Sequence, residues 1–142
     1  MAIKTILMVD DDRDFVEAVS SFLESNGYRV VRAYDGREGL RLAKMEQPDL
    51  ILMDIVMSER TEGFFAVQEL RRVPGLSAVP IFVVSSLYQT LTDFRIPPGS
   101  EWLSHDEFFA KPVDLPAFLD KIRGRIGDGA GNRSTNTGAS PP

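Results

Sequence analysis

Four short apolar runs of this sequence each end in polar residues that could carry out chemistry. These residues are Asp10, Asp11 and Asp12 after the first run, Asp54 after the second, Ser85 and Ser86 after the third, and Lys111 after the fourth. Carboxylates that converge need a counter-charge, and a hard divalent cation held by oxygen ligands supplies it at the lowest cost. Mg²⁺ fits best, because it accepts few protein ligands and keeps waters or substrate phosphate in its octahedron. A carboxylate beside Mg²⁺, with a hydroxyl and an ammonium group nearby, is equipped to receive a phosphoryl group.

These groups can converge only if the runs before them are parallel strands of one sheet. Apolar runs predict strands at residues 3–9, 28–33, 50–53, 79–84 and 107–110, and helical spacing predicts helices near 15–23, 36–45, 64–70 and 114–126. Strict alternation of strands and helices indicates a parallel sheet covered by helices on both faces. Ligands of such a sheet bind beyond the carboxyl ends of its strands, which is where the polar residues stand.

Two stretches depart from this alternation. Pro97, Pro98 and Gly99 stand where a fourth helix is expected, between residues 87 and 105, and they leave room for a short helix at best. Residues 127–142 are rich in Gly, Asn, Ser, Thr and Pro, so they cannot bury enough apolar surface to offset their ordering entropy. We therefore predict one domain at residues 1–126 and a flexible tail at residues 127–142.

Composition narrows the classes of function. The chain has 142 residues, of which 43% are apolar and 26% charged, as is typical of one soluble globular domain. It contains no cysteine, and this excludes disulfides, thiolate nucleophiles and Cys-ligated metals. The formal net charge of -5 argues against direct binding to nucleic acid. The sequence has no run long enough to span a membrane and no signal-peptide pattern, so we expect a cytoplasmic protein without membrane contact.

Four blocks of the sequence match a known family in order and with nearly its spacing. The blocks ILMVDDD (6–12), LILMD (50–54), IFVVSS (81–86) and FFAKP (108–112) resemble the signature blocks of response-regulator receiver domains. The resemblance extends over about residues 3–126. It implies an α/β fold of the flavodoxin-like type, a three-layer α/β/α sandwich whose five parallel strands have the order 2-1-3-4-5.

The resemblance also implies a reaction and its partners. Asp54 would attack the phosphohistidine of a sensor histidine kinase, or of a phosphotransfer protein, and form an aspartyl phosphate. The chain would be a regulatory phosphoacceptor in a two-component system or phosphorelay and not an enzyme, with only self-catalysed phosphoryl uptake and slow autodephosphorylation. An unidentified downstream protein would read the changed conformation, and a weak homodimer is left open.

In the pattern of this family, acidic side chains and one backbone carbonyl hold Mg²⁺. Asp11 would bind the ion directly and Asp10 mainly through water. Asp54 and the backbone carbonyl of Val56 would complete the protein ligands.

The remaining family positions concern the phosphoryl oxygens and the response to them. Ser85 would hydrogen-bond one phosphoryl oxygen and Lys111 would pair with another, with Lys111-Pro112 as a cis peptide. Phe108 lies at the aromatic switch position of the family. Movement of Ser85 toward the phosphate would let Phe108 turn inward, which makes a two-state element biased by local charge.

Two segments depart from the family pattern. Residues 57–63 read MSERTEG, which lacks the proline of the family and is one residue longer, so we expect a looser loop beside the phosphate. The region at residues 87–106 is longer than usual and holds the Pro-Pro-Gly. The usual output and dimer face of the family is therefore not carried over to this chain.

Three alternatives stay open on the sequence alone. A haloacid-dehalogenase-type phosphatase also opens with an apolar strand and Asp-x-Asp, which residues 10–12 satisfy, and its nucleophile would be Asp10. Against it stand the small size and the lack of a late acidic pair, since Asp114 stands alone. A receiver-like interaction module that is no longer phosphorylated is the second alternative, and the altered loop favours it. The third concerns completeness, because the tail could begin a linker to an output domain.

Overall fold

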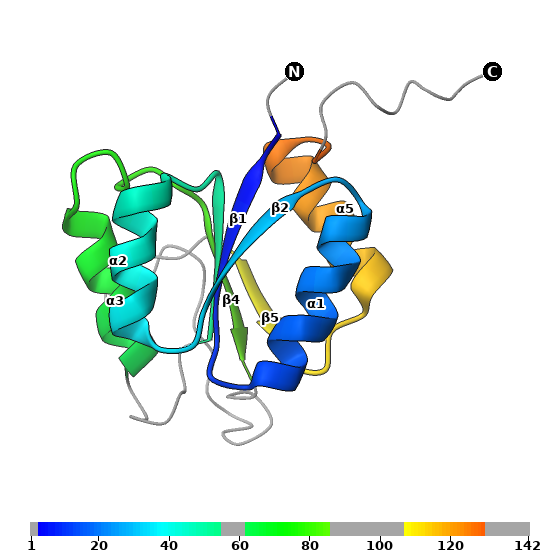
Figure 1. Cartoon of the computed structure of the whole chain (residues 1–142), viewed down its shortest axis with the longest axis horizontal. Coiled ribbons are helices and arrows are strands. Elements are labelled where there is room, and N and C mark those ends of the chain that lie inside the picture. Colours follow the sequence, from blue (N-terminus) through cyan, green and yellow to red (C-terminus); the bar gives the residue numbers. More distant parts are fainter. Residues whose placement is uncertain (1–2, 55–61, 86–106, 130–142) are drawn as a thin grey trace.

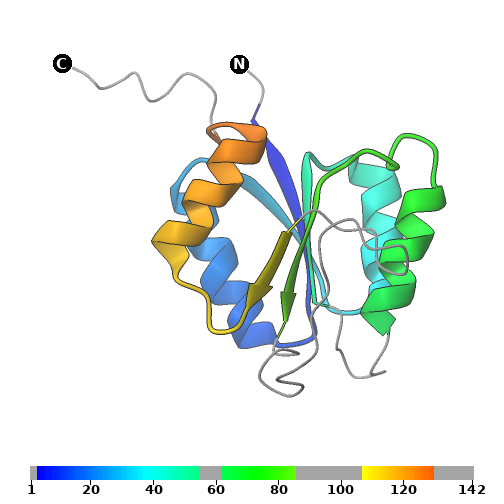
Figure 2. The same ribbon diagram turned by 180° about the vertical axis from the view of Figure 1, so that it is seen from behind.

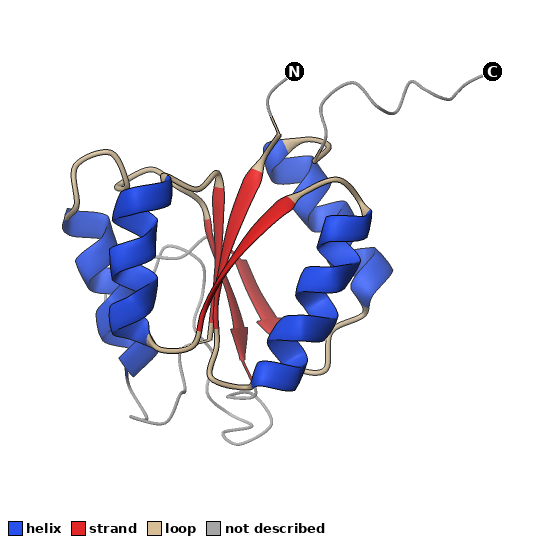
Figure 3. Cartoon of the chain, in the orientation of Figure 1, coloured by secondary structure: helices blue, strands red, loops and turns tan. Residues whose placement is uncertain are grey.

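A five-stranded parallel sheet lies between two layers of helices (Figures 1 and 3). The computed structural model describes residues 3–54, 62–85 and 107–129. Along the chain the elements are β1 (Thr5–Val9), α1 (Arg13–Ser25), β2 (Arg29–Ala33), α2 (Gly36–Glu46), β3 (Leu50–Met53), α3 (Glu62–Arg72), β4 (Ile81–Ser85), β5 (Glu107–Ala110) and α5 (Leu115–Ile126). The strand order is β2-β1-β3-β4-β5, and every pair of neighbours is parallel. The predicted flavodoxin-like topology is therefore confirmed.

Side chains of the central strands alternate between two hydrophobic cores. In β1, Leu7 and Val9 belong to the core under α2 and α3, whereas Ile6 and Met8 belong to the core under α1 and α5. Figure 1 and the reverse view in Figure 2 show these two pairs of helices on opposite faces of the sheet. Each fully buried aliphatic side chain stabilises the fold by roughly 1.5 to 3 kcal/mol. Burial on both faces explains why the strands read as continuous apolar runs.

Aspartate side chains cap the N-termini of three of the helices. Asp12 caps α1 by accepting a hydrogen bond from the N–H of Phe15 at 3.2 Å, and Asp35 caps α2 by accepting one from the N–H of Glu38 at 2.8 Å. Asp114 caps α5 in the same way. Each such cap is worth about 1 kcal/mol and fixes the helix start just beyond a strand end. Within the described part of the chain, no helix is both long and apolar enough to cross a lipid bilayer.

Helix α2 lies directly against the end of β1. A Cβ atom on Gly39 would stand 2.7 Å from Cγ2 of Val9, so a residue with a side chain could not occupy this position without displacing Val9. The backbone of Val9 continues directly into Asp10. The position of α2 is therefore coupled to the strand end that carries the acidic residues.

The segment after α5 is fixed to the end of the sheet where β1 and β2 begin. The hydroxyl of Tyr28 donates a hydrogen bond to the carbonyl oxygen of Gly127 at 2.6 Å, and the N–H of Lys4 donates one to the carbonyl oxygen of Gly129 at 2.9 Å. Gly129 is buried, and a Cβ on it would lie 2.6 Å from the backbone nitrogen of Tyr28. Here the structure differs from the prediction of a flexible tail that begins at residue 127. The rest of that predicted tail, residues 130–142, lies outside the described residues, as do residues 86–106.

Replacing Tyr28 with phenylalanine should lower the free energy of unfolding at neutral pH by about 1 kcal/mol, because the bond to Gly127 is lost. Burial raises the pKa of Tyr28 above 10.0, Arg123 opposes the rise and Asp128 adds to it. A phenol with a raised pKa in the folded state contributes stability below its unfolded pKa, and this contribution is lost as the pH rises through the folded pKa. Urea unfolding across the alkaline range should therefore show a steeper loss for the native chain than for Tyr28→Phe.

The matched control for this prediction is Tyr34→Phe. The hydroxyl of Tyr34 makes a longer hydrogen bond, 3.3 Å to Glu17, at the exposed surface. At neutral pH we expect Tyr34→Phe to lower the free energy of unfolding by less than Tyr28→Phe does. An equal decrease in the free energy of unfolding for the two variants would show that the bond from Tyr28 to Gly127 stabilises the fold no more than a surface hydrogen bond.

Candidate functional site

Three carboxylates meet where β1 and β3 end side by side. The register pairs Val9 with Met53, so the next residues, Asp10 and Asp54, leave the sheet together, and the N–H of Asp54 donates a hydrogen bond to the carbonyl oxygen of Val9 at 3.0 Å. Asp10 is 1% exposed and Asp54 is 5% exposed, whereas Asp11 is exposed. One oxygen from each of the three lies within 4.8 Å of the others. The predicted convergence of these carboxylates is present in the structure.

Asp12, the third acidic residue after β1, begins helix α1. The side chain of Asp12 caps α1, while its backbone N–H donates a hydrogen bond to Oδ1 of Asp10 at 2.9 Å. The cap fixes the turn, and the turn fixes the side chain of Asp10. Of the acidic triplet, Asp10 and Asp11 therefore offer ligand oxygens, and Asp12 is structural.

The ammonium group of Lys111 lies among these carboxylates. Lys111 directly follows β5, and its Nζ is 2.9 Å from Oδ2 of Asp10 and 3.5 Å from Oδ2 of Asp54. Its side chain is only 17% exposed. The Lys111-Pro112 peptide bond is cis, as the resemblance implied. The ion pair to Asp10 is the shorter of the two. The sequence did not indicate that Lys111 pairs with Asp10.

Burial and charge act against each other in this cluster. Burial raises the pKa of Asp10 above 3.8, although Lys111 and the N–H of Asp12 oppose the rise. Burial alone would lower the pKa of Lys111, but Asp10 and Asp54 outweigh it and the pKa lies above 10.5. Three acidic groups thus face one cation. The site retains an excess of negative charge that a further cation would relieve.

The arrangement of oxygens suits a small divalent cation. Ligand oxygens around Mg²⁺ lie about 3 to 4 Å apart, given metal–oxygen distances near 2 Å. The three carboxylates need only a slight contraction to reach such separations. In addition, Oδ2 of Asp10 has the ion pair with Lys111 but accepts no hydrogen bond of regular geometry within the described residues. Hard oxygen donors with spare lone pairs fit Mg²⁺.

The other predicted site residues are placed only in part. Ser85 ends β4 opposite Ala110, while its side chain lies outside what the structure describes, as do Val56 and Ser86. Phe108 is half-buried and packs against the core under α2 and α3. The structure therefore brings together Asp10, Asp11, Asp54 and Lys111.

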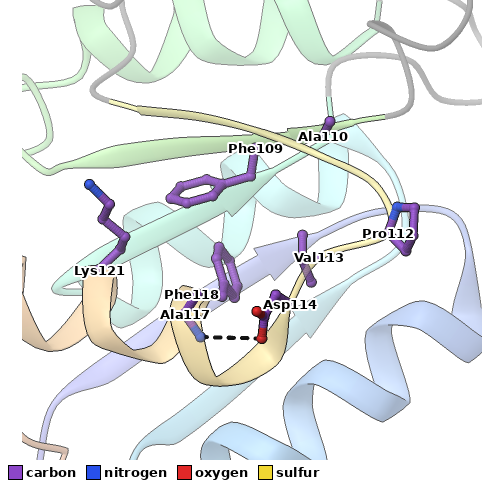
Figure 4. A pocket seen from close by; sticks show the side chains of 8 residues that line it. All are labelled: Phe109, Ala110, Pro112, Val113, Asp114, Ala117, Phe118 and Lys121. Atoms are coloured by element: carbon purple, nitrogen blue, oxygen red, sulfur yellow. Dashed lines mark hydrogen bonds between the residues drawn. The ribbon is translucent and has the colours of Figure 1, made fainter.

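The aromatic residue next to Phe108 faces the other side of β5. Phe109 packs edge-on against Phe118 with ring centroids 4.8 Å apart, and its ring lines a hollow of about 200 Å³ between β5 and α5 (Figure 4). Asp114 and Lys121 lie at this hollow, but none of the three clustered carboxylates lines it. The hollow is therefore separate from the site at the strand ends.

One contact of the site joins two segments that no sequence pattern links. Nζ of Lys111 lies over the ring of Phe15, 4.3 Å from the ring centroid. Phe15 lies in the helix that the sequence predicts near residues 15–23, and its half-buried side chain packs against the core under α1 and α5. No spacing in the sequence links a residue of α1 to a residue after β5.

Comparison with known proteins decides the family. Residues 6–123 match the family model of the response regulator receiver domain. The chain belongs to this family. The receiver domain is 29% identical over 125 residues to the polar-differentiation response regulator DivK of Brucella anthropi, covering 88% of the chain and 98% of DivK. It is 34% identical over 119 residues to the DNA-binding dual master transcriptional regulator RpaA of Synechocystis, covering 83% of the chain and 47% of RpaA.

Solved structures agree with this assignment. Chemotaxis protein CheY4 of Vibrio cholerae has a TM-score of 0.75 at 26% identity, with 88% of this chain and 100% of CheY4 covered. The receiver domain of sensor histidine kinase PA1611 from Pseudomonas aeruginosa has a TM-score of 0.74 at 25% identity, covering 89% of this chain and 100% of that one, and it was solved with a magnesium ion coordinated in its active-site cleft. This receiver domain is thus a regulatory module of two-component signalling that responds to phosphorylation. The family match speaks against the phosphatase alternative.

Proposed function

We propose that this receiver domain accepts a phosphoryl group on Asp54 from the phosphohistidine of a sensor histidine kinase or phosphotransfer protein. The observation that carries the proposal is the cluster at the strand ends, where Asp54 lies beside Asp10, Asp11 and the ammonium of Lys111. A carboxylate with acidic neighbours for a metal and a cation for the phosphoryl oxygens has the parts that phosphoryl transfer requires.

Asp54 is the nucleophile of this reaction. One of its carboxylate oxygens forms a bond to phosphorus, and the bond from phosphorus to the donor nitrogen breaks, so that the electron pair leaves with the imidazole. Asp54 suits this role because it stands at the end of a central strand, held by its backbone bond to Val9. Asp10, Asp11, Asp54 and the backbone carbonyl of Val56 would hold Mg²⁺, which when bound neutralises charge on the phosphoryl oxygens.

Lys111 and Ser85 would contact the phosphoryl oxygens once the group is attached. Lys111 is already 3.5 Å from Asp54, so its ammonium needs to move little to pair with an oxygen on the new group. Ser85 would donate a hydrogen bond to another oxygen. Phe108, a half-buried residue of β5 that packs against the core under α2 and α3, would then turn inward and transmit the change to the last strand and helix.

The partners follow from the same chemistry. A histidine kinase or phosphotransfer protein supplies the group, and a downstream protein reads the altered surface in the cytoplasm. Direct nucleic-acid binding is not part of the proposal, because the chain carries a net charge of -5. We take residues 1–126 as the receiver domain, to which residues 127–129 are hydrogen-bonded. The phosphorylated form would be lost slowly by autodephosphorylation.

Incubation with acetyl phosphate and Mg²⁺ tests the proposal. Intact-protein mass should rise by one phosphoryl group, and a chelator added beforehand should prevent the rise. Reduction of the acyl phosphate with borohydride converts the labelled aspartate to homoserine, which peptide mass spectrometry should locate at position 54. Homoserine at position 10 would instead indicate the phosphatase-type nucleophile. No labelling under any condition would indicate an interaction module that is not phosphorylated.

A further inference from the structure

We infer that Phe15 is a positioning residue for Lys111, which it holds in the phosphoryl-acceptor site through a cation–π contact. The inference rests on the proposed function, because it concerns the lysine that is to meet the phosphoryl oxygens. Nothing in the acidic cluster itself would draw attention to a phenylalanine on α1.

The contact is direct and well placed. Nζ of Lys111 lies 4.3 Å from the centroid of the Phe15 ring, within the range in which the negative face of an aromatic ring attracts a cation. The same ammonium lies 2.9 Å from Oδ2 of Asp10 and 3.5 Å from Oδ2 of Asp54. The cation therefore contacts both a ring face and a pair of carboxylates.

The ring is fixed from two directions. Phe15 is in the first turn of α1, and its N–H donates to the capping carboxylate of Asp12. The half-buried side chain packs against the core under α1 and α5. A ring held by the first turn of the helix and by the core can restrict the rotamers of the flexible Lys111 side chain.

An aromatic ring suits this task better than a hydrogen-bond acceptor would. The four-carbon stem of lysine allows many rotamers, and its ammonium can turn to any nearby acceptor. A ring limits these rotamers without taking an N–H away from the phosphoryl oxygens. It also keeps water from the ammonium, whose side chain is 17% exposed, and a desolvated cation interacts more strongly with both neighbours.

The rival explanation is packing alone, in which the ring fills space and the nearby cation is incidental. The chain offers a matched control in Phe22, which is also on α1, also half-buried and packed against the same core. No cation lies over Phe22 among the described residues. Phe22→Leu should therefore reproduce the packing loss of Phe15→Leu without the loss of a cation–π contact.

The first experiment observes the contact in the chain itself. The sequence has four lysines, Lys4, Lys44, Lys111 and Lys121, so selective ¹³C labelling of lysine gives a simple spectrum. The ε protons of Lys111, assigned by Lys111→Arg, should be shifted upfield by the ring current, and the shift should vanish in Phe15→Leu but persist in Phe22→Leu. Unshifted protons in the native chain would overturn the inference.

The second experiment measures the consequence for phosphoryl uptake. Phenylalanine with one, two or three ring fluorines is introduced at position 15 by codon suppression, which weakens the negative ring face while nearly preserving its size. The rate of uptake from acetyl phosphate should fall stepwise with fluorination. Phe15→Leu should be about threefold to tenfold slower than the native chain, and Phe15→Trp should retain the native rate.

Two results of the second experiment would contradict the inference. Equal rates across the fluorinated series would show that ring electrostatics do not matter, and an equal slowing by Phe22→Leu would show a packing effect. Because acetyl phosphate is a small molecule, the measured rate does not depend on the docking of a partner protein. If the native chain takes up no phosphoryl group, the proposed function fails, and the lysine spectrum still decides whether Phe15 positions Lys111.

Discussion

Asp54→Asn should abolish phosphoryl uptake from acetyl phosphate and at the same time stabilise the metal-free chain. The amide cannot attack phosphorus, so the mass gain should disappear entirely. Asparagine also removes one of three acidic groups whose oxygens lie within 4.8 Å of one another and face a single lysine. Relief of this repulsion should raise the free energy of unfolding without metal by about 1 kcal/mol. Because fewer anionic ligands remain, added Mg²⁺ should stabilise Asp54→Asn less than the native chain.

Two further variants make the result specific. Asp14→Asn alters an exposed carboxylate in the first turn of α1 and should change neither uptake nor the response to Mg²⁺. Asp10→Asn should impair uptake through the metal site while leaving Asp54 able to react slowly at high Mg²⁺. Labelling that persists in Asp54→Asn and is absent in Asp10→Asn would mean that the nucleophile is Asp10.

Lys111→Met should slow phosphoryl uptake by about a hundredfold and yet tighten the binding of Mg²⁺. The slower rate follows from the loss of a cation that stabilises charge on the phosphoryl oxygens. The tighter metal binding follows because the ammonium, 2.9 Å from Asp10, competes with any cation at the same carboxylate. Uptake kinetics by mass spectrometry and Mg²⁺ titration by calorimetry would measure the two opposite effects on the same sample.

The stability of this variant provides an independent check. Without metal, Lys111→Met leaves the buried carboxylate of Asp10 without its ion-pair partner, which should cost about 3 kcal/mol. Added Mg²⁺ should restore most of this loss, since it replaces the missing positive charge. Lys121→Met, which changes an exposed lysine on α5, should have none of these effects. Weaker Mg²⁺ binding by Lys111→Met would show that the lysine supports the metal site and does not compete with it.

The residues that follow strand ends could be predicted because their placement depends on local sequence alone. The strand Leu50–Met53 was predicted with its observed bounds, since four buried residues stand between Pro48-Asp49 and Asp54. Once the strands are parallel and adjacent, their carboxyl ends must meet. The cluster of carboxylates therefore follows from pattern and topology without any knowledge of side-chain contacts.

Contacts between distant segments could not be predicted in this way. Phe15 and Lys111 are far apart in the sequence, and either residue alone has an ordinary local explanation. The start of the first strand was also misplaced, because Ile3 reads as apolar strand but is 59% exposed and lies before Thr5. Similarly, the fourth strand begins at Ile81, after Pro80, which has no N–H to donate to a neighbouring strand.

The tail boundary was missed for a related reason. Composition indicates whether a segment can bury apolar side chains, and residues 127–129, which read GDG, have none. They are held by hydrogen bonds that the Tyr28 hydroxyl and the Lys4 N–H donate to their backbone carbonyls, and by the fit of Gly129, which has no side chain, against Tyr28. Neither property is visible in a count of apolar residues.

The anchored segment also fixes the place on the domain where residue 129 lies. Gly129 is bonded beside Lys4, at the end of the sheet where β1 begins, whereas the carboxylates lie at the end where β1 stops (Figure 1). A fluorophore, affinity tag or second domain joined just after Gly129 would therefore start at the end of the sheet opposite to the acidic cluster. Such a fusion should leave kinase access to Asp54 unobstructed, whereas a cut at Ile126 would remove the hydrogen bonds that Tyr28 and Lys4 donate to this segment.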